Sequence, residues 1–81
     1  MKNYYHGIKE IQYIYINEWS DPELIYKGSN ISWFHLEDAL YSDFLESGGK
    51  DGDYDAFSDY VIANEYYVLE IAEYLLENKI A

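Results

Sequence analysis

The chain has 81 residues, which suffice for a single domain, residues 1–81, with one modest hydrophobic core. A hydrophobic content of 49% excludes a disordered acidic tail, and the absence of cysteine excludes disulfide bonds. The 16 acidic residues face 5 lysines and no arginine, and the formal net charge of −11 argues against direct binding to nucleic acids or to anionic membranes.

The N-terminal half predicts a small antiparallel sheet. Residues 11–16 are β-branched and aromatic, which favours a strand that is apolar on both faces. Such a strand is covered on both faces or has one face in an interface. Residues 17–22 indicate a turn, residues 23–27 a returning strand, and residues 31–34 either a third short strand or the lead into a helix.

A first helix is predicted from about His35 to Ser47, where apolar residues recur at helical spacing. Ser32 or Asn30 is placed to cap its start. Gly48-Gly49 is typical of a helix end, because glycine adopts the left-handed conformation that closes a helix.

A second helical stretch is predicted from about Tyr54 to Lys79. Asn64 interrupts its apolar stripe, so we expect a break near Ala63, with a short strand over residues 60–63 as the alternative. Together these elements predict an α+β fold in which a short antiparallel β hairpin or meander packs against two to three α-helices.

No arrangement of residues points to catalysis. His6 and His35 lie far apart in the sequence without a nucleophile beside either, and no glycine-rich phosphate loop is present. A chain of this length leaves little volume for a pocket that shifts pKa values. We therefore expect a protein that is not an enzyme and that has no cofactor.

The acidic loop after the first helix resembles the opening of a calcium site. Asp51, Asp53 and Asp55 alternate as in an EF-hand loop. The sixth position, however, is Ala56 instead of glycine, and the twelfth is Ile62 instead of glutamate. We expect a solvated loop in which Asp53 or Asp55 caps the next helix and no metal binds, with a weak calcium site as the alternative.

Negative charge is concentrated in the second part of the chain: residues 1–36 have a net charge of −1 and residues 37–81 one of −10. An ordered row of carboxylates on one side of the molecule would imitate the phosphates of a nucleic acid and attract a basic surface. The alternative is a solvated face that serves solubility. The acids that we predict to contact a partner are Glu37, Asp38, Asp43, Glu46, Asp51, Asp53, Asp55, Asp59, Glu70, Glu73 and Glu77.

Tyrosine is abundant, with 11 residues, more than this core can bury. Because tyrosine offers a large contact area and a hydroxyl group at low entropic cost, it is enriched at interfaces. The tyrosines that we expect to be exposed are Tyr4, Tyr5, Tyr41, Tyr54, Tyr66 and Tyr74. Of these, Tyr41, Tyr54 and Tyr66 are predicted partner contacts, and Trp19 on the turn is a further anchor.

One stretch resembles a known family. Ile14-Tyr15-Ile16-Asn17, Glu23-Leu24, Gly28 and Trp33-Phe34, within residues 13–38, are similar to the opening strands of the ArdA antirestriction proteins. Those proteins are acidic DNA mimics of mobile elements that occupy the DNA site of type I restriction enzymes. This chain has about half the usual length of that family, and no convincing copy of the family's later domains is visible in it. The resemblance implies a small acidic inhibitor of a DNA-handling protein, and phage anti-CRISPR proteins have a similar size and charge.

These observations predict a phage- or mobile-element-encoded inhibitor that binds the nucleic-acid-binding surface of a host defence protein, such as a restriction or CRISPR nuclease. No segment predicts a signal peptide or a membrane span, so we expect it in the host cytoplasm. The alternative is an acidic adaptor or a homo-oligomeric structural module, such as a homodimer, in which the apolar strand and the tyrosines form the subunit interface.

Overall fold

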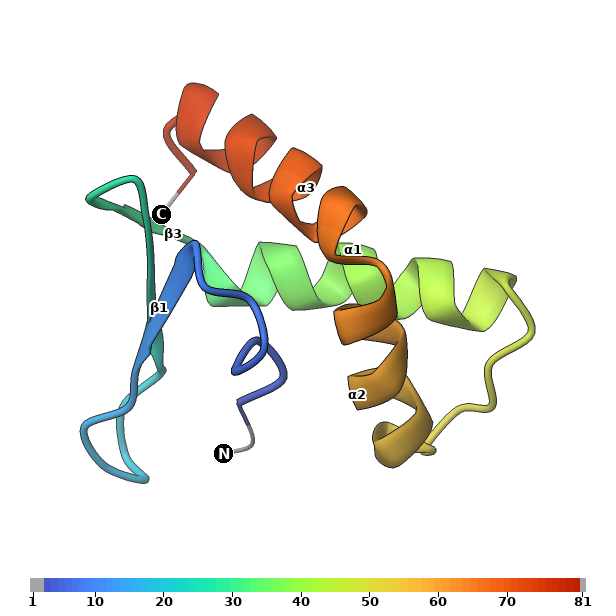
Figure 1. The fold of residues 1–81 in the computed structure, drawn as a ribbon. Coiled ribbons are helices and arrows are strands. Elements are labelled where there is room, and N and C mark those ends of the chain that lie inside the picture. The colour runs from blue at the N-terminus through green and yellow to red at the C-terminus, as the bar shows by residue number, and fades with distance from the viewer. Residues whose placement is uncertain (1–2, 81) are drawn as a thin grey trace.

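The computed structural model describes residues 3–80, which form a three-stranded antiparallel sheet and three helices (Figure 1). The elements in chain order are β1 (Ile11–Ile14), β2 (Glu23–Tyr26), β3 (Ser29–Ile31), α1 (Trp33–Glu46), α2 (Tyr54–Ala63) and α3 (Glu65–Glu77). The strands follow one another in the sheet in the order β1-β2-β3. The predicted α+β fold, with a meander packed against three helices, is confirmed.

The first strand is shorter than predicted, and the third strand lies earlier in the chain, because residues 33 and 34 already belong to α1. β1 ends at Ile14 instead of Ile16, because its four residues pair only with the four residues of β2, and β2 is preceded by Pro22, which has no N–H to donate. A two-residue turn at Lys27 and Gly28, both with positive φ, connects β2 directly to β3. The third strand therefore starts at Ser29, earlier than the predicted residue 31.

α1 begins with the predicted cap. The Oγ atom of Ser32 accepts a hydrogen bond from the backbone N–H of His35 at 3.3 Å, which selects Ser32 over Asn30. The helix buries Leu36, Leu40 and Phe44 and ends at Glu46. Gly48 follows with a φ of 98°, in the left-handed region, as predicted.

The second helical stretch divides at Asn64, as predicted. The Nδ2 group of Asn64 donates to the carbonyl of Tyr60 at 2.8 Å, so the side chain binds the last turn of α2 where the backbone leaves the helix. The alternative strand over residues 60–63 is wrong, because these residues complete α2 and Val61 is buried one turn after Phe57. Asp53, one of the two predicted caps, accepts a hydrogen bond from the N–H of Ala56 at 3.1 Å.

The core lies between the sheet and the helices. It is formed by Tyr5, Ile8, Ile11, Leu24, Tyr26, Ile31, Leu36, Leu40, Phe44, Phe57, Val61, Val68, Ala72 and Leu75. The prediction that Tyr5 is exposed is wrong, since its side chain is 3% exposed. The reason is a turn in which the N–H of Ile8 donates to the carbonyl of Tyr5, which folds the N-terminal segment back onto the core.

Candidate functional site

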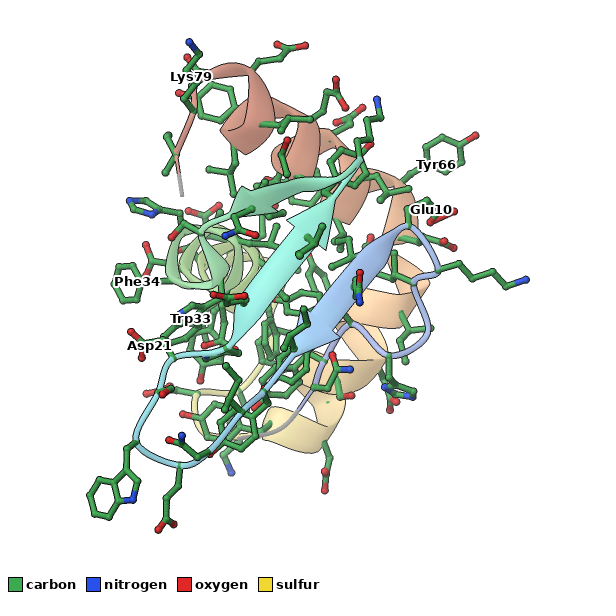
Figure 2. All side chains as sticks on the ribbon, turned by 90° about the vertical axis from the view of Figure 1, so that its left-hand side faces the viewer. Glu10, Asp21, Trp33, Phe34, Tyr66 and Lys79 are labelled. Carbon is green, nitrogen blue, oxygen red and sulfur yellow. The ribbon has the colours of Figure 1, made fainter. Side chains whose placement is uncertain are left out.

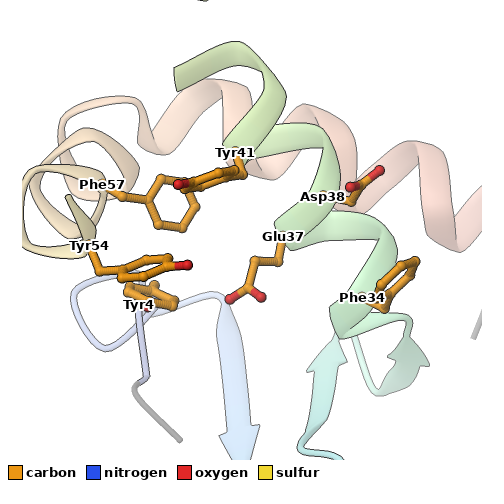
Figure 3. Close-up of a pocket in the computed structure, with 7 residues that line it drawn as sticks. All are labelled: Tyr4, Phe34, Glu37, Asp38, Tyr41, Tyr54 and Phe57. Carbon is orange, nitrogen blue, oxygen red and sulfur yellow. The ribbon is translucent and has the colours of Figure 1, made fainter. Parts of the chain in front are cut away.

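One face of α1 carries two acidic and two aromatic side chains. Phe34, Glu37, Asp38 and Tyr41 recur at the i, i+3, i+4 and i+7 spacing, which aligns them along the helix beside its buried stripe. The N-terminal segment and the first turn of α2 face this row. Together they form a pocket of about 170 Å³ that is lined by Tyr4, Phe34, Glu37, Asp38, Tyr41, Tyr54 and Phe57 (Figure 3).

Ring contacts hold the aromatic wall of the pocket in place. The Tyr41 and Tyr54 rings are stacked, with centroids 5.9 Å apart and an interplanar angle of 24°. Phe57, which is buried in the core, makes edge contacts with Tyr4 at 5.0 Å and with Tyr41 at 5.1 Å. Pairs of this geometry stabilise both rings beyond the area that they bury. The wall is therefore part of the packed structure, although Tyr54 itself is 53% exposed.

Tyr41 also anchors the acidic loop between α1 and α2. Its hydroxyl donates to Asp51 Oδ1 at 2.6 Å and accepts from the N–H of Gly52 at 2.9 Å. The hydrogen bond to Asp51 raises the pKa of Tyr41. Two bonds to one side chain of α1 hold this loop against the helix, so the Asp51 carboxylate has a defined position beside the pocket.

Glu37 is the acidic group that is most enclosed in the pocket. Its side chain points from α1 toward the rings of Tyr4 and Tyr54 (Figure 3). Glu37 is half-buried, and this burial raises its pKa. Among residues 3–80, no cation or hydrogen-bond donor offsets that effect. A carboxylate held away from water without a compensating charge has a strong electrostatic preference for a cation.

Several of the predicted partner-binding residues are brought together at this pocket. Glu37, Asp38, Tyr41 and Tyr54 line it, and Asp51 is bound to Tyr41. Asp53 and Asp55 are exposed on either side of Tyr54, and Asp55 lies close enough to Tyr4 to act on its pKa. Asp59 is exposed one turn after Asp55 on α2.

Other predicted residues lie elsewhere. Asp43 is half-buried at Tyr67 on α3, and a side-chain interaction with Asp43 is the largest cause that raises the pKa of Tyr67 to about 12. Glu46 is exposed at the end of α1 and contributes to the same shift. Tyr66 is 90% exposed at the start of α3, and it projects from the side of the molecule opposite Phe34 (Figure 2).

The predicted row on α3 is also separate from the pocket. Glu73 forms a salt bridge with Lys27 of the β2–β3 turn, with 2.8 Å between Nζ and Oε2, while Glu70 and Glu77 are exposed. The C-terminal half of α3 and the N-terminal segment lie on opposite sides of α1 (Figure 1). The predicted acids therefore occupy separate parts of the surface instead of one side, because Asp43 and Glu37 flank the buried stripe of α1 on its two edges.

The exposure of the aromatic residues agrees only in part with the exposure predicted from the sequence. Tyr54, Tyr74, Tyr66 and Trp19 are exposed, as predicted, with Trp19 at 89%. Tyr4 and Tyr41 are half-buried because they line the pocket. Sequence reasoning missed Phe34, which is 59% exposed, because it placed this residue in a third strand or in the lead into the helix, and not in the helix itself. Its spacing of three residues from Glu37 was the available signal.

Within residues 3–80, no three histidine or acidic side chains, Asp51, Asp53 and Asp55 included, converge closely enough to hold a metal ion. In the same part of the chain, no helix has the length and apolar character needed to cross a membrane.

The chain matches no known family model, no curated protein and no solved structure.

Proposed function

We propose that this protein binds a basic partner protein and blocks the surface with which that partner holds nucleic acid, acting as a DNA mimic. The observation that carries the proposal is the group of carboxylates held around one aromatic pocket. We call this region the pocket surface, and it comprises Tyr4, Phe34, Glu37, Asp38, Tyr41, Asp51, Asp53, Tyr54 and Asp55.

The carboxylates of the pocket surface are ordered. Glu37 and Asp38 belong to α1, Asp51 is held by Tyr41, and Asp53 caps α2. Like charges that are fixed near one another repel, and a partner with complementary positive charge relieves this repulsion. The adjacent tyrosine rings add apolar contact area, which polyanion imitation by charge alone does not supply.

The partner class follows from charge and from the resemblance in residues 13–38. Basic surfaces that are shaped for phosphates recognise carboxylates at similar spacing, and the absence of arginine excludes bidentate phosphate contacts by this chain itself. The resemblance to antirestriction proteins favours a host defence nuclease of the restriction or CRISPR class as the partner. Duplex DNA would compete with this chain for binding to such a partner.

The test uses two double variants that each remove two negative charges. Glu37→Gln/Asp38→Asn alters the pocket surface, and Glu70→Gln/Glu77→Gln alters the exposed acids of α3. Host proteins that bind this chain are captured from lysate and purified. The displacement of labelled duplex DNA from each captured protein is then measured for the wild type and for both variants. We expect the wild type and the α3 variant to displace DNA, and the pocket variant to be weaker by about tenfold or more.

Three outcomes contradict the proposal. A captured protein that still binds DNA while it holds this chain, or an affinity of that protein for this chain that does not fall between low and moderate salt, excludes the DNA-mimic mechanism. A stable homo-oligomer in analytical ultracentrifugation, together with no displacement of DNA from any captured protein, would instead identify a homo-oligomeric structural module.

A further inference from the structure

The pocket between α1, α2 and Tyr4 has the size of a site for one side chain. Its volume of about 170 Å³ lies below the range of about 300–1,000 Å³ that is typical of sites for drug-sized ligands and cofactors. Five of its seven lining residues are aromatic and the other two are carboxylates. We propose that this pocket binds the guanidinium group of one arginine side chain of the basic partner.

The two carboxylates of the pocket determine which charge its occupant can have. Glu37 extends into the pocket and Asp38 lies on its rim, so an anion would be repelled. A neutral apolar group would enclose Glu37 further and leave its charge without compensation, which is costly. A cation provides that compensation and forms a charge-assisted hydrogen bond with the carboxylate.

The aromatic lining favours the same occupant. A cation within about 6 Å of the centroid of an aromatic ring is attracted to the face of that ring. Tyr54 is 53% exposed, and it remains stacked on Tyr41, whose hydroxyl is held by Asp51 and Gly52. Because these rings are already fixed, an incoming cation orders few side chains when it binds.

Arginine fits this combination better than lysine. The guanidinium group is planar, so one of its faces stacks on a tyrosine ring while its edge donates two parallel hydrogen bonds to a carboxylate. It is also more weakly hydrated than an ammonium group, so it enters a half-enclosed site at a lower desolvation cost. Glu37 and the hydroxyl end of Tyr54 point toward one another across the pocket, so a guanidinium group between them can contact both the carboxylate and the tyrosine (Figure 3).

This inference rests on the proposed function only for the source of the arginine, which is the partner protein. Binding of a free arginine derivative can be measured without any partner. A pocket that binds the derivative in a protein that displaces no DNA would retain this inference and overturn the proposed function. The reverse result would retain the proposed function and overturn the inference.

The experiment titrates ¹⁵N-labelled protein with N-acetyl-arginine amide and follows the amide resonances by NMR. We expect saturable shifts centred on the residues that line the pocket. N-acetyl-citrulline amide has nearly the same shape without the charge, and we expect it to bind about tenfold more weakly. N-acetyl-lysine amide should bind about threefold more weakly than the arginine derivative, since it lacks the bidentate contact.

Three variants complete the test. Glu37→Gln should weaken binding of the arginine derivative about tenfold, and Tyr54→Leu about threefold, because each removes one of the two contacts. Glu77→Gln removes the same charge at an exposed position of α3 and should leave the affinity unchanged. Shifts spread over all acidic residues, equal effects of Glu37→Gln and Glu77→Gln, or equal binding of the citrulline derivative would each overturn the inference.

Discussion

Tyr41 and Asp51 are joined by a hydrogen bond of 2.6 Å between Oη and Oδ1, although ten residues separate them in the chain. Through this bond and the adjacent one from Gly52, a helix that belongs to the core positions a loop that does not. The same tyrosine ring stacks on Tyr54 at the start of α2. One side chain therefore connects α1, the acidic loop and α2 at the pocket.

Removal of the Tyr41 hydroxyl should loosen the loop selectively. In Tyr41→Phe, the Gly52 amide loses its acceptor and Asp51 loses its donor, while the ring contacts remain. We expect the hydrogen exchange of the Gly52 amide to become faster, with little change in the core amides. Tyr54→Phe is the matched control and should leave this exchange unchanged. An unaltered Gly52 rate in Tyr41→Phe would show that the loop is held by other contacts.

Glu37 should destabilise the folded protein at neutral pH. Burial raises its pKa in the folded state, so the folded protein binds this proton more tightly than the unfolded chain does. The unfavourable effect is thus present above the folded pKa and disappears as the pH falls toward the unfolded value. We expect Glu37→Gln to raise the melting temperature at pH 7, with a gain that declines toward pH 4.

Removal of any acidic residue makes the net charge less negative, which can itself raise the melting temperature by reducing repulsion. The pH profile of Glu37→Gln therefore requires a control. Glu77→Gln removes an equal charge from an exposed position. A larger gain at pH 7 for Glu37→Gln than for Glu77→Gln, with convergence of the two melting temperatures at acidic pH, is the expected result. Identical profiles would mean that only the total charge matters.

The salt bridge between Lys27 and Glu73 should have the opposite pH dependence. The hydrogen bond with Lys27 lowers the pKa of Glu73 in the folded protein. The salt bridge therefore stabilises the fold above the pKa that Glu73 has in the unfolded chain, and this stabilisation is lost as the pH falls through the pKa of the folded protein. We expect Glu73→Gln to be less stable than Glu70→Gln at pH 7 in low salt. The difference should vanish at high ionic strength, where exposed charges are screened.

The N-cap of α1 can be tested by comparing Ser32 with a serine inside the same helix. Ser32→Ala removes the acceptor for the N–H of His35, and we expect a loss of about 1 kcal/mol in the free energy of unfolding. Ser42 is exposed within the same helix, where alanine is the better helix former, so Ser42→Ala should be neutral or slightly stabilising. Urea denaturation of both variants measures the difference. Equal stabilities would contradict the capping role.

Phe57 connects the pocket to the core, and its removal should affect both. Its side chain is 1% exposed and contacts Tyr4, Tyr41 and Phe44. Phe57→Ala should cost about 3–5 kcal/mol of stability, a large part of what a domain of this size has. Tyr66→Ala, at a residue that is 90% exposed, should change the stability by less than about 0.5 kcal/mol. A small loss in Phe57→Ala would indicate that the core repacks around the cavity.

Features that depend on a few neighbouring residues were predictable. The caps at Ser32 and Asp53 and the break at Asn64 follow from hydrogen bonds within one turn of each residue. The strand boundaries were less accurate, because the length of β1 depends on its partner β2 across the loop of residues 15–22. Burial of Tyr5 was missed for the same reason, since it requires the N-terminal segment to fold back onto distant elements.

The amino-acid sequence alone determined the α+β architecture, the periodic apolar stripes that form the core and the excess of acid in residues 37–81, because composition and local spacing specify each of them. The tertiary structure decided which acids lie together. Tyr4, the face of α1 with Glu37, and Tyr54 meet only when the N-terminal segment and α2 pack against α1. Local spacing does not encode such an encounter, since it depends on how separate elements bury their apolar faces against one another.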